Sequence, residues 1–355
     1  MRKYPYLQYL TEAEIQVLCA AVQSGYVHPT ANLALAEGAN RVGATTELAA
    51  RSIHEENPHW LLHQRARLLD TTDFTNASSA LGEIRAYGAL LEAGLRVRPT
   101  PSVNGKAVLP DFEVDAGDGT AIVEVHSRQM APTEREALAD FHQELARKAE
   151  ENRTKGKNIT MDHTDIAPLG HGDPAKAGDS VLTNAISKIA SIKQNEKQID
   201  ATKPFVLWLD LQDPTVWGLP VSDAQLAPCF TDWHDGQVGA GAFWYALYGQ
   251  KDDPMLDMGG CDYVTRPMLH DGRFVRPTNI SAVVLSLPDT TVLMEHPAAN
   301  KPLSPLLRAG LIRLPYFKME LSLMEWRPGL VKDMVALQHA SVDAAAAALL
   351  ATNSP

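Results

Sequence analysis

The chain has little cysteine and no long hydrophobic run, and each absence limits what the protein can be. Its three cysteines, Cys19, Cys229 and Cys261, lie far apart, and none belongs to a C-x-x-C pair. This pattern argues against a disulfide framework and against a cysteine-based zinc site, so we expect a reducing compartment. No segment approaches the roughly 18 apolar residues that a membrane span needs, and the N-terminus shows no apolar leader. The sequence therefore predicts a cytoplasmic protein without a membrane contact.

Positive charge is also in short supply. The 32 lysines and arginines face 43 aspartates and glutamates, which gives a formal net charge of −11. This is the wrong sign for a protein that coats nucleic acid non-specifically, so any contact with nucleic acid must be local. At 355 residues, with 45% hydrophobic and 21% charged residues, the chain has the composition of a folded protein. Its length predicts two domains, or one domain with large insertions.

Familiar catalytic signatures are missing too, including G-x-S-x-G, a Walker lysine loop and a cysteine nucleophile motif. The hydrophobic periodicity instead predicts three regions: a helical N-terminal region at 1–75, an α/β core at 76–213, and a mixed C-terminal region of unknown role at 214–355. Within the core we expect an insertion at about 129–179.

The core is predicted as helix, strands, helix, strand. An N-cap within 76–79 starts a helix that ends at Gly94. Three short strands follow, separated by Asn104-Gly105 and by the glycine-containing turn at 116–119. Further on, the pattern predicts these elements: a polar helix at 133–152, an amphipathic helix at 181–199 and a buried strand at 204–211.

The C-terminal region is harder to interpret. The aromatic block 243–248 could stack bases, but adjacent aromatics more often belong to a core, which is the interpretation we favour. Gly239-Ala240-Gly241 is predicted as a turn. The segments 280–287 and 291–295 predict a hairpin, and the alanine-rich stretch 342–351 predicts a terminal helix.

The residues that carry chemistry lie on two of the core strands. Side chains alternate along a strand, so Glu124 and His126 point to the same side. If the strands pair across the turn at 116–119, the register brings Asp111 near Glu124, and two acids in a Val- and Ile-rich sheet need a counter-charge. A hard cation such as Mg²⁺ supplies it. Glu83, on the preceding helix, could be a third acid at the same place.

This order of residues resembles the PD-(D/E)XK nuclease superfamily, which has the restriction-endonuclease-like fold. The resemblance covers roughly 76–213 and rests on Glu83, Pro110-Asp111 and Glu124-Val125-His126. It implies a core of helix, mixed sheet and helix, with helical N-terminal and mixed C-terminal additions. It also implies that Asp111 and Glu124 bind Mg²⁺ (or Mn²⁺), with Glu83 as an accessory acid.

The sequence departs from the superfamily pattern at His126, where the pattern has a lysine that positions or activates the attacking water. Histidine is shorter and largely neutral at pH 7, but it is competent as a general base. Lys193 falls inside the apolar sector of the predicted helix 181–199, so we nominate it as the substitute lysine. Lys197 and Lys188 are alternates, and Gln198 resembles a glutamine of some members.

The resemblance predicts a Mg²⁺-dependent phosphodiester hydrolase that acts on DNA or RNA. Local phosphate contacts would come from a basic cluster, namely Arg147, Lys148, Arg153, Lys155 and Lys157. A homo-oligomer is compatible with the sequence. The alternative is a catalytically inactive nuclease-fold protein that binds nucleic acid or protein, because His126 replaces lysine and the net charge is −11.

The same residues also have ordinary explanations. Glu124 and His126 could form an ion pair on a solvent-facing strand, Glu83 could cap its helix, and Lys193 could cover apolar surface with its stem. A third hypothesis places zinc or manganese in the loop that holds Asp162, His163, Asp165, His171 and Asp173. We favour a polar surface loop there, because metal sites usually need ligands on rigid elements.

Overall fold

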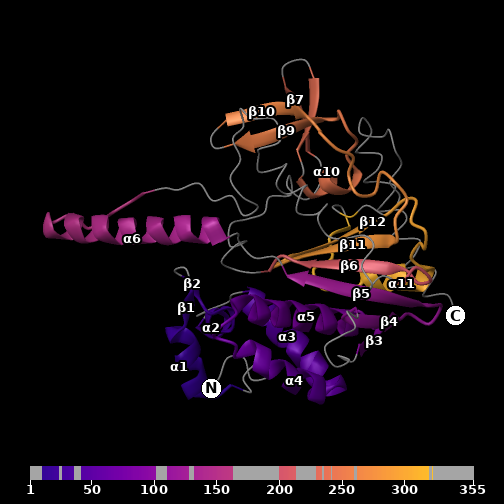
Figure 1. The fold of residues 1–355 in the computed structure, drawn as a ribbon, viewed down its shortest axis with the longest axis horizontal. Coiled ribbons are helices and arrows are strands. Elements are labelled where there is room, and N and C mark those ends of the chain that lie inside the picture. Colours follow the sequence, from indigo (N-terminus) through magenta and orange to yellow (C-terminus); the bar gives the residue numbers. More distant parts are fainter. Residues whose placement is uncertain are drawn as a thin grey trace.

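A computed structural model gives the fold of the chain (Figure 1). It describes residues 10–23, 26–35, 41–100, 110–127, 132–162, 200–212, 229–233, 236–240, 242–259, 262–319 and 322. The protein is of the α/β class, as predicted. A six-stranded mixed sheet, with strand order β12-β11-β6-β5-β4-β3, lies at its centre.

The N-terminal region is mainly helical, as the periodicity predicts. Its helices are α1 (Glu12–Ala20), α2 (Pro29–Leu35), α3 (Arg41–Glu56) and α4 (Pro58–Leu68), and a small hairpin joins β1 (Val22–Gln23) to β2 (Tyr26–Val27). The side chain of Asn57 caps α4 by accepting from the backbone N–H of Trp60, and Pro58 occupies the first turn. These helices lie below α5 and the sheet in the view of Figure 1.

Helix α5 (Phe74–Glu92) connects this helical layer to the sheet. It begins earlier than predicted, because Asp73 is the N-cap and its carboxylate accepts from the N–H of Thr75 at 2.8 Å. Its end is as predicted, since Gly94 adopts a left-handed φ of 79°. A Cβ added at Gly88 would lie 2.3 Å from the Cα of Ala49, so glycine is what lets α3 approach this closely.

The sheet combines a meander with a parallel centre. Strands β3 (Arg96–Pro99), β4 (Phe112–Asp115) and β5 (Thr120–Ser127) pair antiparallel in sequence order, which confirms the predicted meander. Strand β6 (Phe205–Asp210) is buried along its whole length and runs parallel to both of its neighbours, β5 and β11 (Ile280–Leu287). β11 then forms the predicted hairpin with β12 (Thr290–Glu295). Two strands of the C-terminal region therefore belong to the same sheet as the core.

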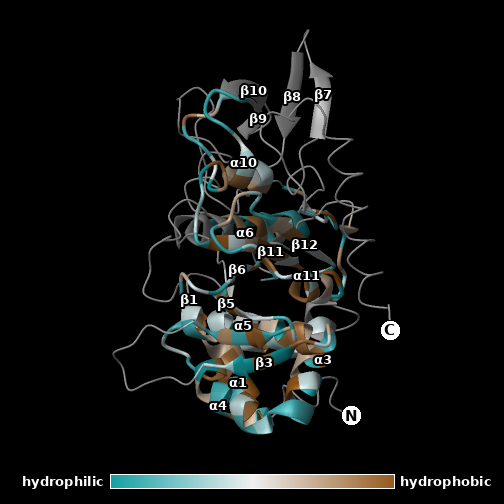
Figure 2. Ribbon diagram, turned by 90° about the vertical axis from the view of Figure 1, so that its right-hand side faces the viewer, coloured by the Kyte–Doolittle hydropathy of each residue, from teal (hydrophilic) through white to brown (hydrophobic). Residues whose placement is uncertain are grey.

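One face of the sheet and the helices beneath it share a hydrophobic core. The core joins Ile84 and Tyr87 of α5 to Val123 of β5 and Trp208 of β6. In Figure 2 the helices on this side carry hydrophobic and hydrophilic residues next to each other, as elements with one buried face do. Alternation along β5 then places Glu124 and His126 on the opposite face.

The rest of the described chain comprises α6 (Pro132–Thr154), α10 (Ala242–Tyr248), α11 (Pro305–Ile312) and a second sheet. That sheet has the order β10-β9-β8-β7 and contains β7 (Cys229–Trp233), β8 (Gly236–Ala240), β9 (Pro254–Gly259) and β10 (Asp262–Pro267). The predicted turn at 239–241 is wrong for Gly239 and Ala240, which belong to β8, while Gly241 lies outside the described residues. The aromatic block forms α10 and is buried, which confirms the core interpretation. Within the described ranges, we find no helix with the length and hydropathy required to cross a bilayer.

Candidate functional site

The β4–β5 hairpin fixes the position of Asp111. Asp111 directly precedes β4, whose first residue, Phe112, pairs with Val123 of β5. The backbone N–H of Val125 donates to Oδ2 of Asp111 at 2.7 Å, and the N–H of Thr100 donates to its carbonyl at 3.0 Å. Both neighbouring segments therefore hold this residue, and the predicted pairing of the two strands is confirmed.

Glu124 and His126 lie on the same side of β5, as the alternation predicts. Nε2 of His126 is 3.9 Å from Oε1 of Glu124. The Glu124 residue is only 8% exposed, while the His126 side chain keeps 32% of its exposure. The pair is thus not a fully solvated one: the carboxylate is buried, and the imidazole reaches from it toward solvent.

Glu83 has a partner that the sequence did not suggest. Both of its carboxylate oxygens accept from Arg67, Oε2 from Nη1 at 2.6 Å and Oε1 from Nη2 at 2.8 Å. Since α5 begins at Phe74, Glu83 lies well inside the helix, and the capping interpretation is wrong. The acid predicted to be accessory thus forms an ion pair between α4 and α5.

The electrostatics of Asp111 link these elements. Burial raises the pKa of Asp111 from 3.8 to about 7, and the negative charge of Glu83 adds to the rise. The N–H of Val125 and the charge of Arg67 lower the pKa, but by less. Near neutral pH the Asp111 carboxyl is therefore shared between its protonated and ionised forms. A cation next to it would favour the ionised form.

The acids do not converge as a triad. Among the residues that the structure describes, no three His, Cys, Asp or Glu side chains come together in a group that could hold a metal ion. The two predicted ligands come from different segments, Glu124 from β5 and Asp111 from the position directly before β4. Carboxylates are ligands that Mg²⁺ takes in proteins, commonly one or two per ion, with water and substrate phosphate as the other ligands.

A second ion pair connects α5 to the carboxyl end of β6. Nη1 of Arg85 donates to Oδ2 of Asp210 at 2.8 Å, and Nε donates to the hydroxyl of Thr46 at 2.9 Å. A Cβ at Gly82 would lie 2.0 Å from Oγ of Ser127. The helix that carries Glu83 therefore sits directly against the carboxyl ends of β5 and β6.

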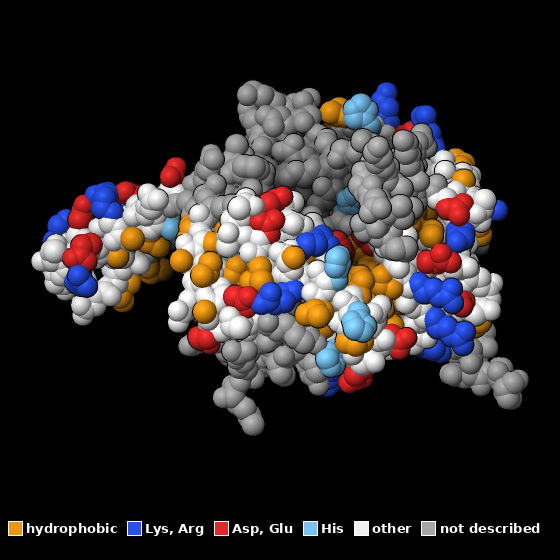
Figure 3. Space-filling model, turned by 60° about the horizontal axis from the view of Figure 1, so that its bottom comes forward, with side chains coloured by type: hydrophobic (Ala, Val, Ile, Leu, Met, Phe, Trp, Pro, Cys, Tyr) orange, Lys and Arg blue, Asp and Glu red, His pale blue; other side chains and the backbone are white. Residues whose placement is uncertain are grey.

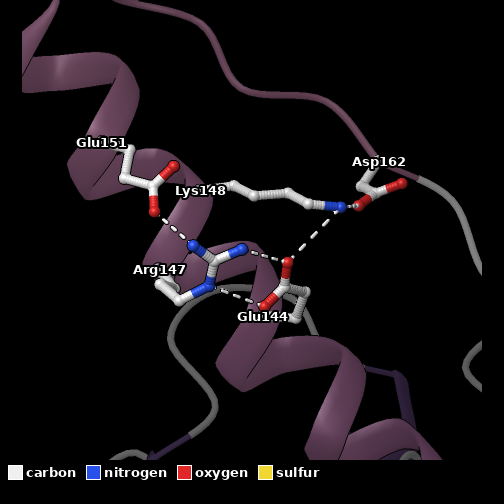
Figure 4. A network of polar contacts seen from close by, with 5 residues as sticks. All are labelled: Glu144, Arg147, Lys148, Glu151 and Asp162. Carbon is white, nitrogen blue, oxygen red and sulfur yellow. Dashed lines mark hydrogen bonds and ion pairs between the residues drawn. The ribbon is translucent and has the colours of Figure 1, made fainter.

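The basic cluster predicted to contact phosphate is partly neutralised. Arg147 bonds with Glu144 and with Glu151, and Nζ of Lys148 lies 2.6 Å from Oδ2 of Asp162 (Figure 4). The contact with Asp162 raises the pKa of Lys148. Figure 3 likewise shows acidic and basic side chains interspersed along α6. These contacts weaken the case for α6 as a phosphate-binding surface.

Several nominated residues lie outside the described part of the chain. These are Lys188, Lys193, Lys197 and Gln198 of the predicted helix 181–199, together with His163, Asp165, His171 and Asp173 of the loop hypothesis. The predicted terminal helix at 342–351 also lies outside it. Their proposed roles remain predictions.

Sequence reasoning missed the partners of the acids. Arg67, Gln64 and Asn76 were not nominated, and neither were Arg85 and Asp210. The only available signal was a run of arginines at the end of the helical segment before α5, which by itself suggests a favourable interaction with the helix dipole.

The protein is of the α/β class, and its β4–β5 hairpin carries the buried carboxyl group of Glu124 and, directly before β4, the partly buried one of Asp111. Comparisons of the chain with models of protein families, with curated proteins and with solved structures return no significant match.

Proposed function

We propose that the protein is a divalent-metal-dependent phosphodiester hydrolase, a nuclease of the PD-(D/E)XK type with a restriction-endonuclease-like core. The proposal is supported by the position of Asp111 directly before β4, by Glu124 on the adjacent strand β5, and by His126, whose Nε2 lies 3.9 Å from Oε1 of Glu124. The order α5, β3, β4, β5, β6 supports it, because the first three strands form an antiparallel meander and β6 joins β5 in parallel.

The chain's own residues would share the work as follows. Asp111 and Glu124 would hold Mg²⁺ or Mn²⁺, which supplies polarisation of the scissile phosphate when bound. His126 would orient the attacking water and accept its proton at Nε2, because its imidazole lies on the same side as Glu124 and is partly exposed. Lys193 stays our candidate for a second group that orients this water.

Binding without catalysis is the second candidate. It is favoured by the bidentate contact of Arg67 with Glu83, which occupies the third acid, and by His126 in the place of lysine. In that case the same core would bind nucleic acid or protein, and the binding would not depend on metal.

The experiment is a nicking assay with plasmid DNA and with labelled RNA in the presence of Mg²⁺ or Mn²⁺. We expect cleavage by the wild-type protein and its loss in Asp111→Ala and in Glu124→Ala. Glu113→Ala is the matched control, because Glu113 lies on β4 next to the site but is half-exposed and pairs with Lys203 at 3.4 Å. Cleavage that is undiminished in both site variants would refute the assignment.

Calorimetry separates the two candidates. A nuclease requires an Mn²⁺ site that is lost in Asp111→Ala. Nucleic-acid or protein binding that is unchanged by a chelator, in a protein without such a site, would favour the inactive module.

A further inference from the structure

Helix α4 carries two histidines one turn apart, His59 and His63. At about 100° per residue the two positions lie about 40° apart around the helix axis, so both side chains belong to one face. The buried residues of α4, which are Leu61, Gln64 and Leu68, lie on the opposite face. Both histidines are exposed, and Figure 3, which brings the lower side of the molecule forward, shows histidine side chains grouped on that surface.

The helix gives these two side chains a fixed spacing. Asn57 caps its first turn by accepting from the backbone N–H of Trp60. The indole of Trp60 packs edge-on against Tyr87 of α5, with ring centroids 5.0 Å apart. Metal ligands are positioned best on rigid elements, and a capped helix that is packed against its neighbour is such an element.

The surroundings of the two histidines leave room for a cation. Within the described residues, neither imidazole takes part in a hydrogen bond or an ion pair, so its ring nitrogens are available. The exposed neighbours on this side of the helix, Leu62 and Ala66, are uncharged. Arg67, one turn after His63, donates to both oxygens of Glu83 at 2.6 and 2.8 Å, which offsets its positive charge.

Two imidazoles on successive turns of a helix can chelate a transition-metal ion. Imidazole nitrogen is a ligand that Zn²⁺, Ni²⁺ and Cu²⁺ favour, and helices with the motif H-E-x-x-H bind Zn²⁺ through two histidines at this same spacing. Mg²⁺ prefers oxygen ligands. Among the residues that the structure describes, no third His, Cys, Asp or Glu joins the pair in a group that could hold a metal, so water would supply the other ligands.

We propose that His59 and His63 form a surface site for Zn²⁺ on α4, with two protein nitrogen ligands and water at the remaining positions. The site is separate from the acids of the β4–β5 hairpin and does not depend on the proposed function. Its water ligands are exchangeable, which distinguishes it from a closed structural zinc site with four protein ligands.

The test is a calorimetric titration of the full chain with Zn²⁺ alone at about pH 7.5, where most imidazoles are neutral. We expect His59→Gln and His63→Gln each to weaken Zn²⁺ binding about tenfold or more, because a chelating pair becomes a single contact. His142→Gln is the matched control, since His142 is exposed on α6 and has no histidine one turn away. This control should bind Zn²⁺ like the wild type.

The pH dependence identifies the ligand type. Lowering the pH to about 5.5 should weaken the binding, because Zn²⁺ competes with protons for the neutral imidazole. A wild-type protein that binds no Zn²⁺, wild-type affinity in both single variants, or binding that is unchanged at the lower pH would each overturn the inference. The proposed function is judged on other residues: Asp111→Ala should keep the Zn²⁺ site on α4, and His59→Gln should keep the nicking activity.

Discussion

The buried ion pair between Arg85 and Asp210 gives the most direct test of how α5 is attached to the sheet. Both side chains are only 3% exposed, and Nη1 of Arg85 lies 2.8 Å from Oδ2 of Asp210. Asp210→Asn keeps the shape of the side chain but removes its charge. The guanidinium then stays buried among residues of α5, β6 and the Thr46 hydroxyl without this counter-charge.

The expected loss follows from that burial. Removing one partner of a buried pair costs about 3–5 kcal/mol, because the remaining charge is desolvated without compensation. Arg85→Met should cost a similar amount, since it leaves the carboxylate behind. The double variant Arg85→Met/Asp210→Asn leaves neither charge, and it should be destabilised by about 2 kcal/mol less than the sum of the single variants.

Urea unfolding followed by tryptophan fluorescence is a suitable assay, because Trp208 lies buried on β6, two residues before Asp210. Glu150→Gln serves as the control: Glu150 pairs with Arg153 on α6, where both side chains are more than half exposed, and its loss should change stability by no more than about 0.5 kcal/mol. An Asp210→Asn variant as stable as this control would refute the reasoning.

Two further outcomes follow from the structure, and a third follows from the proposed metal site. Gly88→Ala should destabilise by about 1–3 kcal/mol, seen as a lower melting temperature, because its Cβ would lie 2.3 Å from backbone atoms of Ala49 that cannot rotate away. Asp111→Asn should become progressively more stable than wild type between about pH 4 and pH 7. The reason is that the pKa of Asp111 is raised from 3.8 to about 7 in the folded protein, so the unfolded chain loses this proton at lower pH than the folded protein does. The free energy of unfolding of the wild type therefore falls as the pH rises through this range. Denaturant unfolding at several pH values measures this, and a difference independent of pH would contradict it. Mg²⁺ should raise the melting temperature of wild type at pH 8 but not that of Asp111→Asn, because a ligand of the folded state stabilises only a protein that still has its site.

Much of the fold could be predicted from local patterns. The meander follows from short strands between glycine-containing turns, and the end of α5 follows from Gly94, whose positive φ other residues rarely adopt. The buried strand β6 follows from an apolar run with no polar face. Each of these signals depends on a few neighbouring residues, so it can be recognised in the sequence alone.

The start of α5 shows the limit of such signals. Several residues near it can cap a helix, and the choice of Asp73 over the 76–79 segment depends on where the preceding chain leaves α4. The same holds for the site. The antiparallel pairing of β4 with β5 could be predicted because a turn sets the register of a hairpin, whereas Arg67 meets Glu83 through the packing of two helices. How two helices cross cannot be predicted from the hydrophobic periodicity within either helix.

Two acids, Glu83 on α5 and Asp111 before β4, have different electrostatic surroundings. Glu83 of α5 accepts two hydrogen bonds from Arg67 of α4, whereas burial raises the pKa of Asp111 to about 7, although its Oδ2 accepts from the backbone N–H of Val125. A divalent ion that binds at Asp111 has to displace only a proton, whereas one that binds at Glu83 has to displace a bidentate guanidinium, which is harder. If the proposed metal site exists, we therefore expect the ion at the β4–β5 hairpin rather than at Glu83.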